Sequence, residues 1–312
     1  MSEHTITELL SPAFLSRMQN MLGDEYESFL KSYEAPRTYG LRVNTAKISC
    51  DEFERIVPFP VTPIPWISNG YFYPEDVRPS FCPLYQAGLF YLQEPSAMTP
   101  ASCLPVTPGE NVLDLCAAPG GKATALGAML NGSGLLVAND ISASRARALL
   151  RNIELFGITN AFVTNETPAH LGKHFPEFFH KILLDAPCSG EGMFRKEEAL
   201  ARDWTPEKSH ELSCLQKELI LQAADMLRPG GLLLYSTCTF APEEDEEVVS
   251  HLLENRPDME LLELPEYKGF TSVSRNGETE IRHLYAAYIS FPIRCRERDT
   301  FLHCFVKRAE LI

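Results

Sequence analysis

Residues 109–122 read Gly-Glu-Asn-Val-Leu-Asp-Leu-Cys-Ala-Ala-Pro-Gly-Gly-Lys, and this stretch decides the fold. Its apolar run at 112–115 is typical of a buried parallel strand, which breaks at Pro119 and the two glycines after it. A helical pattern begins at Lys122. Glycines allow close approach to the backbone, and the first turn of a helix offers unpaired N–H groups. The stretch therefore predicts a small-ligand site made of a strand, a tight turn and a helix N-terminus.

Strand and helix patterns alternate after this turn, which predicts a parallel α/β sheet. Strands are expected at 111–116, 134–139, 160–164, 181–185 and 231–237. Helices are expected at 122–131, 142–156, 207–228 and 243–255. The acidic run 243–247 is expected to open the last helix, where carboxylates favour the dipole, and to have no functional role. Further strands are expected from 259 to 307, with a polar loop at 272–280, so that a catalytic domain spans 106–312.

The sequence before residue 106 has a different pattern. Apolar residues recur at three- and four-residue spacing through 5–33, which predicts helix, with a start at Ser11-Pro12. The segment 41–45 is a short strand candidate. The stretch 58–83 is rich in proline and aromatic residues, and we expect an ordered surface loop because proline disrupts regular helix. Residues 1–105 are therefore expected to form a smaller α+β region.

Composition limits the class of protein. The chain has 312 residues, of which 45% are hydrophobic and 22% charged, as in ordinary globular proteins. It has no apolar run of the roughly 18 residues that span a membrane, and its N-terminus lacks a signal-peptide pattern. Nine scattered cysteines without a C-x-x-C pair favour reduced thiols and argue against a zinc site, so we expect a cytoplasmic protein. The net charge of −14 counts weakly against nucleic-acid binding.

The acid Asp140 follows the second expected strand, about twenty residues after the glycine turn. In nucleotide-binding α/β folds an acid at this place accepts hydrogen bonds from ribose hydroxyls, while an N-cap for the next helix is the competing interpretation. The turn matches neither G-x-G-x-x-G nor G-x-x-x-x-G-K-[ST], which disfavours a dinucleotide and a P-loop nucleotide. A ligand with ribose and adenine but no phosphate remains, and S-adenosylmethionine fits this description.

Two cysteines, Cys188 and Cys238, follow the expected strands 181–185 and 231–237. If these strands are neighbours about 4.8 Å apart, both thiols can reach one substrate at the carboxyl edge of the sheet. A thiolate that adds to carbon-6 of cytosine activates carbon-5 for methylation. Asp185 would protonate or hydrogen-bond the ring nitrogen, and nearby Lys122 or a helix start would favour the thiolate. Spacing alone does not rank one cysteine above the other.

Five ordered motifs resemble the Sun/Nol family of RNA cytosine-5 methyltransferases. They lie at 41–45, 93–98, 114–122, 185–192 and 236–239, and the stretch 190–196 is most similar to the bacterial RsmF-type 16S rRNA enzymes. The resemblance covers roughly 36–307 and implies a class I, Rossmann-like S-adenosylmethionine-dependent methyltransferase fold. It implies that Cys238 is the nucleophile, that Cys188 assists product release and that Asp185 contacts the target base.

The same resemblance implies the residues that bind the methyl donor S-adenosylmethionine. They are Cys116, Ala117, Ala118, Pro119, Gly120, Gly121, Lys122, Asp140, Arg145, Asn165 and Asp185. The family often has an aspartate after the third strand, for which Asn165 or Glu166 substitutes here. RsmF-type enzymes usually continue into a PUA-like region, which this chain is expected to lack. We expect an RNA partner, either rRNA or tRNA, no metal, no membrane and a monomer.

Basic residues indicate where RNA would bind. Arg195 and Lys196 follow the Cys188 loop and are candidate phosphate contacts. The arginines of the expected helix 142–156 more simply form a solvated face; they are Arg145, Arg147 and Arg151. Arg294, Arg296 and Arg298 could flank a strand or an RNA path. Aromatic residues of 58–83 could stack on bases, although packing is the simpler role. A structured cytosine would have to be extruded to reach the thiols.

Two alternatives remain open from the residues. The sequence Asp185-Ala186-Pro187-Cys188 loosely resembles the [Asn/Asp]-Pro-Pro-[Tyr/Phe] turn of exocyclic-amine methyltransferases, but it lacks the second proline and the aromatic residue. Their chemistry forms no covalent adduct and would leave Cys238 without a task. The second alternative is a catalytically idle RNA-binding factor of ribosome assembly, which the presence of both cysteines and the full glycine turn disfavours.

Overall fold

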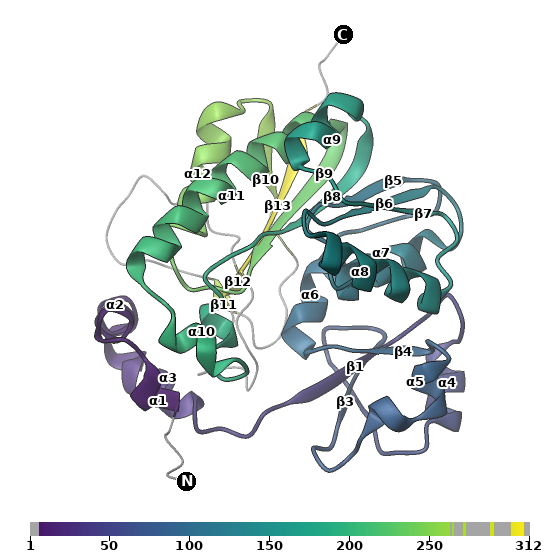
Figure 1. Cartoon of the computed structure of the whole chain (residues 1–312), viewed down its shortest axis with the longest axis horizontal. Coiled ribbons are helices and arrows are strands. Elements are labelled where there is room, and N and C mark those ends of the chain that lie inside the picture. Colours follow the sequence, from purple (N-terminus) through teal and green to yellow (C-terminus); the bar gives the residue numbers. More distant parts are fainter. Residues whose placement is uncertain (1–5, 263, 265–270, 273–287, 290–300, 309–312) are drawn as a thin grey trace.

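The computed structural model describes residues 6–262, 264, 271–272, 288–289 and 301–308. A small four-stranded sheet near the N-terminus lies beside a larger sheet of seven strands (Figure 1). None of the helices in this described part is long and apolar enough to cross a membrane. The division of the chain at 105/106 stays a prediction.

The chain begins with helices, as the spacing of apolar residues predicts. They are α1 (Ile6–Leu9), α2 (Pro12–Leu22), the 3-10 turn η1 (Gly23–Glu25) and α3 (Tyr26–Ser32). Ser11 caps α2, because its hydroxyl accepts a hydrogen bond from the Phe14 amide at 3.1 Å. Phe14 and Phe29 are fully buried and pack with Phe194 and Trp204, which lie far along the chain. These helices therefore pack on the segment that follows Cys188.

The small sheet is antiparallel and has the order β2-β3-β1-β4. Its strands are β1 (Tyr39–Val43), β2 (Thr62–Pro63), β3 (Gly70–Tyr73) and β4 (Phe90–Leu92). The helices around it are α4 (Cys50–Ile56), η2 (Pro79–Phe81), α5 (Pro83–Gln86) and α6 (Pro95–Cys103). The expectation of a loop throughout 58–83 is wrong. The prolines flank the segment 70–73 without interrupting it, so its aromatic residues pair with β1 as strand β3.

The large sheet has the order β10-β13-β9-β8-β5-β6-β7. Its strands are β5 (Asn111–Asp114), β6 (Leu135–Asn139), β7 (Ala161–Thr164), β8 (Phe179–Asp185), β9 (Leu227–Thr237), β10 (Met259–Leu262) and β13 (Phe301–Lys307). Strands β5 to β9 are parallel, whereas β13 is antiparallel and lies between β9 and β10. A separate pair, β11 (Thr271–Ser272) and β12 (Tyr288–Ile289), is also antiparallel. The predicted α/β class I methyltransferase fold is confirmed.

Helices cover both faces of the large sheet (Figure 1). One face carries α6, α7 (Gly121–Leu130) and α8 (Ala143–Phe156); the other carries α9 (Pro168–His174), α11 (Pro206–Met226) and α12 (Glu246–Asn255). Successive residues of β5 alternate between the two cores: Val112 packs on the α7 side and Leu113 on the α11 side. The carboxyl ends of the parallel strands meet at one edge. Two short elements, η3 (Glu191–Met193) and α10 (Glu198–Arg202), follow β8.

Two boundaries differ from the sequence expectation. Strand β9 begins at Leu227 and not at 231, because Leu227 already pairs with Phe179 before an irregularity in the ladder. Helix α12 begins at Glu246 and not at 243. The acids Glu244 and Asp245 are fully buried in the turn before it. The interpretation of this run as a helix start without further role is therefore wrong.

The C-terminal strands are confirmed where the structure describes them, as β10 and β13. Most of the expected loop at 272–280 lies outside the described residues, as do Arg294, Arg296 and Arg298.

Candidate active site

The glycine turn joins β5 to α7 as the sequence predicts. Gly120 has a φ of +113°, which favours glycine, and a Cβ atom there would also make a tight contact of 3.1 Å with the Leu149 side chain. The Ala117 amide donates to the Asn139 carbonyl at 2.7 Å, and the Pro119 carbonyl accepts from the Asn152 side chain at 2.7 Å. The turn is thus held against β6 and α8 at the carboxyl edge of the sheet.

Asp114, at the end of β5, was not assigned a role from the sequence. It is fully buried, and neither carboxylate oxygen has a hydrogen-bond partner among the residues that the structure describes. Burial raises the pKa of Asp114 to about 8, although the charge of Lys122 acts to lower it. Burial and neighbouring carboxylates, Asp114 first, raise the pKa of the Cys116 thiol far above its ordinary value. Cys116 therefore stays a protonated, unreactive thiol that lines the site.

Asp140 lies just before the start of α8, and its contact with ribose hydroxyls stays a prediction. Its Oδ1 accepts from the Ser142 amide at 2.9 Å, and its Oδ2 pairs with Arg145 at 3.1 Å. Arg145 also donates to the Ala118 carbonyl at 3.0 Å, so this arginine does more than form a solvated face. The carboxylate holds the start of α8, and Arg145 ties it to the glycine turn.

The segment after β7, where the family often has an aspartate, is held by a hydrogen-bond network around Asn139 of β6. The sequence gives no signal for this network. The buried Asn139 amide donates to the carbonyls of Leu115 at 3.2 Å and Glu166 at 3.0 Å, and its oxygen accepts from the Thr164 hydroxyl at 2.9 Å. Asn165 donates to the Asp140 carbonyl at 2.7 Å. Asn139 therefore fixes the ends of three adjacent strands, and Asn165 is exposed at their edge.

Cys188 and Cys238 are brought together. Strands β8 and β9 are parallel neighbours with Asp185 opposite Ser236, and the two sulfur atoms that follow lie 3.3 Å apart. The Cys188 sulfur also accepts from the Cys238 amide at 3.4 Å. The hydrogen bond with Cys238 and burial together raise the pKa of Cys188 well above its ordinary value. Cys188 is thus a neutral thiol at neutral pH.

Asp185 lies between the glycine turn and the thiols. Its Oδ2 accepts from Lys122 Nζ at 2.7 Å, and its Oδ1 accepts from the Ser236 hydroxyl at 2.7 Å. Burial alone would lower the pKa of Lys122, but the negative charges of Asp185, Asp114 and Cys238 raise it overall. Lys122 is therefore a permanent cation that acts on both the carboxylate and the Cys238 sulfur.

A buried carboxylate, Glu191, joins the two cysteine loops. It accepts from the Trp204 indole at 2.9 Å and from the Phe240 amide at 3.0 Å, and it pairs with Arg17 of α2. The hydroxyls of Ser189 and Thr239 are 2.7 Å apart and link the loops a second time. The sequence motif at 185–192 contains Glu191, but nothing in the pattern shows that it is buried.

A second carboxylate, Glu244 in the turn before α12, holds the Cys188 loop by hydrogen bonds. Its Oε2 accepts from the Ser189 amide at 2.9 Å and from the Gln216 amide at 3.0 Å, while Gln216 also donates to the Pro187 carbonyl at 2.8 Å. Beside it, Asp245 accepts from the Thr237 hydroxyl at 2.6 Å. The acidic turn before α12 thus holds both cysteine loops in place.

Two arginines tie the N-terminal sheet and helices to the site. Arg42 of β1 is buried and donates to the Gly121 carbonyl at 2.7 Å and the Thr124 hydroxyl at 2.9 Å. Arg195, expected as a phosphate contact, donates to the Ala35 carbonyl, and its contact with phosphate stays a prediction. Of the two basic residues after the Cys188 loop, Lys196 is the one left exposed at the surface.

Comparison with known proteins places this arrangement in a family. Residues 101–290 match the family described as 16S rRNA methyltransferase RsmB/F. The chain belongs to the RsmB/F methyltransferase family. Residues 10–95 match the N-terminal domain of 16S rRNA methyltransferase RsmF, so the predicted resemblance to RsmF-type enzymes is confirmed.

Relatives of the RsmB/F family include two named ribosomal RNA small subunit methyltransferase F. The protein of Erwinia tasmaniensis is 41% identical over 268 residues, and that of Escherichia coli is 39% identical over 270 residues. These matches cover 82% and 83% of this chain. In both cases they cover 56% of the relative, so the chain spans little more than half the length of these proteins.

Solved structures share the whole fold. A methyltransferase homolog from Pyrococcus horikoshii has a TM-score of 0.86 and 30% identity, with 97% of each chain covered. NSun6 from the same organism, solved with SFG, has a TM-score of 0.82 at 20% identity and covers 97% of this chain, which supports the fold alone. Among the described residues, no group of three or more His, Cys, Asp or Glu side chains is placed to hold a metal ion.

Proposed function

We propose that this chain transfers a methyl group from S-adenosylmethionine to carbon-5 of a cytosine in 16S rRNA through a covalent adduct of Cys238 with carbon-6. The observation that carries the proposal is the pair of thiols 3.3 Å apart, beside the Asp185–Lys122 ion pair and the glycine turn. A methyltransferase acting on an exocyclic amine has no use for two thiols at this place. The names of the relatives support rRNA as the substrate class.

The turn has features that fit the donor. Asp114 presents a buried carboxyl group without a hydrogen-bond partner in the described structure, and the positive charge of a bound donor would favour its ionised form. Asp140 is held at the end of β6, where ribose hydroxyls are bound in this class of sheet. Next to it Ile141 is 68% exposed, an apolar surface suited to adenine. When bound, the donor supplies an electrophilic methyl group.

Cys238 is suited to be the nucleophile, because Lys122 lies close enough for the two charges to interact. Its thiolate forms a bond to carbon-6, and the electron pair of the ring double bond moves to carbon-5, which takes the methyl group. The proton on carbon-5 then passes to water, and the electron pair of that C–H bond restores the ring double bond. The sulfur–carbon bond breaks, and its electron pair returns to Cys238. Cys188, a neutral thiol in hydrogen-bond contact with that sulfur, stabilises the departing thiolate.

Asp185 is suited to hold the target base. Its Oδ2 pairs with Lys122, and an ionised carboxyl group accepts hydrogen bonds and does not donate them. The amino group on carbon-4 of cytosine is a donor that a carboxylate recognises, whereas uracil has a carbonyl oxygen there. Asp185 therefore favours cytosine over uracil and orients its ring toward the thiols.

Radiolabelled S-adenosylmethionine and an in vitro transcript of 16S rRNA test the proposal. After incubation with the chain, the RNA is digested to nucleosides and separated, and the label is expected in 5-methylcytidine. Label in an N-methylated nucleoside would instead indicate an exocyclic-amine methyltransferase. An RNA that binds but takes up no label would indicate the idle assembly factor.

A further inference from the structure

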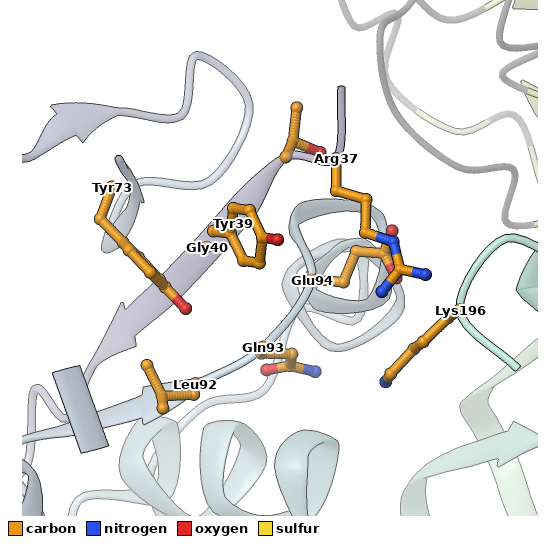
Figure 2. Close-up of a pocket in the computed structure, with 9 residues that line it drawn as sticks. Arg37, Tyr39, Gly40, Tyr73, Leu92, Gln93, Glu94 and Lys196 are labelled. Atoms are coloured by element: carbon orange, nitrogen blue, oxygen red, sulfur yellow. The ribbon is translucent and has the colours of Figure 1, made fainter. Parts of the chain in front are cut away.

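A cavity of about 180 Å³ lies between the small sheet and the segment that follows Cys188 (Figure 2). Tyr39 of β1 and Tyr73 of β3 line one side, and Arg37 and Lys196 line the other. Glu94, just before α6, also lines it. Its lining includes neither cysteine and no residue of the glycine turn, although Gln93 of the lining lies against Gly121.

The two tyrosines form an aromatic wall. Their ring centroids are 5.7 Å apart, and the Tyr39 hydroxyl donates to Glu75 at 3.1 Å, which fixes that ring. Burial raises the pKa of both phenols, so both rings are neutral at physiological pH. Tyr73 is partly exposed and presents its ring to the cavity. A neutral, fixed aromatic ring is the surface on which nucleic-acid bases stack.

The charged side chains lie opposite this wall. Arg37 donates to the Arg195 carbonyl, and neither Arg37 nor Lys196 makes an ion pair within the described part of the chain. Two cations on the rim suit a phosphate group. The Glu94 carboxylate opposes a bare anion in the cavity but can accept hydrogen bonds from the N–H groups of a base. Together these groups suit a nucleotide and not a simple anion.

The cavity is within reach of the reacting thiols. The Gly192 amide donates to the Cys238 carbonyl at 2.9 Å, and Lys196 follows four residues later. Four residues span at most about 14 Å of extended chain, and the turn between Met193 and Lys196 shortens this path. RNA whose cytosine reaches Cys238 therefore passes close to the cavity.

We propose that this cavity binds a nucleotide that flanks the target cytosine in the RNA. The base stacks on Tyr73, the phosphate lies against Lys196 and Arg37, and Glu94 accepts from the base edge. The inference rests on the proposed function for its substrate class. The cavity offers RNA two cations and an aromatic ring near the active site of a chain whose net charge is −14.

The test uses two variants of the whole chain that spare the catalytic residues. Lys196→Ala removes an exposed cation, and Tyr73→Leu removes the stacking ring while it keeps apolar volume. Lys173→Ala on α9 is the matched control, because Lys173 is also an exposed lysine but lies away from the cavity. Tyr73→Phe retains the ring and serves as the conservative variant. The probe is the in vitro 16S rRNA transcript, measured by filter binding at several salt concentrations.

Tyr73→Leu is expected to weaken RNA binding roughly five- to a hundredfold, as for the loss of one stacked base, and Tyr73→Phe to bind like the wild type. Lys196→Ala is expected to reduce the slope of log K against log salt by about 0.7, the value for one phosphate of a single strand. Donor affinity and thermal unfolding should match those of Lys173→Ala.

The outcomes separate this inference from the proposed function. If the wild type methylates RNA and both variants bind RNA as tightly as Lys173→Ala, the cavity proposal is overturned and the proposed function stands. The cavity proposal is also overturned if Lys196→Ala weakens RNA binding and Tyr73→Leu does not. If both variants bind RNA more weakly but the wild type forms no 5-methylcytidine, the cavity proposal is supported and the proposed cytosine-5 methylation is overturned. A wild-type chain that binds no RNA overturns both.

Discussion

The sulfur atoms of Cys188 and Cys238 lie 3.3 Å apart, although fifty residues separate them in the chain. The register of β8 and β9 produces this contact, because Asp185 lies opposite Ser236 and each cysteine follows its strand by a few residues. Two thiols at this distance can both lie beside one bound base. The geometry therefore supports one cysteine that forms the adduct and another that assists its breakdown.

Loss of the Glu191 side chain is expected to destabilise the protein. Glu191→Ala leaves the Phe240 amide and the Trp204 indole without their acceptor and removes the buried partner of Arg17. We expect a loss of about 3 kcal/mol in the free energy of unfolding, measured by urea denaturation. Glu198→Ala, which breaks an exposed pair with Arg202, is the control and should cost about 0.5 kcal/mol or less. Equal losses in the two variants would show that Glu191 does not hold the loops.

Substitution of Asp185 is expected to impair turnover and spare the fold. Asp185→Asn leaves Lys122 without its ion pair and replaces one acceptor oxygen of the side chain by an NH2 donor, which weakens or misplaces the contact with the cytosine amino group. We expect kcat to fall about 10²- to 10⁴-fold. Ser236→Ala removes one hydrogen bond to the same carboxylate and should cost about tenfold. A kcat for Asp185→Asn within threefold of the wild type would rule out its contact with the reacting base.

The buried Asp114 is expected to make stability depend on pH. Burial raises the pKa of Asp114 to about 8, so the folded protein keeps a proton that the unfolded chain releases near pH 4. The contribution of Asp114 to the free energy of unfolding is therefore fully present below about pH 4 and is lost as pH rises toward 8. Asp114→Asn should remove this contribution, of the order of a few kcal/mol. Thermal unfolding without donor, from pH 5 to 8, measures it; parallel pH curves for wild type and variant would contradict the assignment.

Much of the fold could be predicted from the sequence because its signals are local. The run at 112–115, the glycines after it and the alternation that follows depend on residues close in the chain. Strand β3 was missed, since the prolines around 70–73 suggested a loop and only pairing with β1 makes the segment a strand. Tertiary contact decides such a segment, and the sequence alone does not show it.

The candidate site could be predicted for residues in motifs and not for those that support them. Asp185 ends a strand, Cys188 and Cys238 follow strands, and strand ends can be located from the pattern. Glu244 lies in an acidic run that is typical of a solvated helix start. Its role depends on burial beneath the Cys188 loop, which requires the packing of α11 and α12. Long-range burial of a charged residue leaves no local signal.

The central claim, that Cys238 attacks the cytosine and Cys188 assists release, is tested most directly by trapping the adduct. Cys188→Ala is incubated with the 16S rRNA transcript and S-adenosylmethionine, denatured and resolved by gel electrophoresis. We predict a denaturation-resistant RNA–protein band in Cys188→Ala that is absent from Cys188→Ala/Cys238→Ala. A band that persists in the double variant, or no band in Cys188→Ala, would contradict the account.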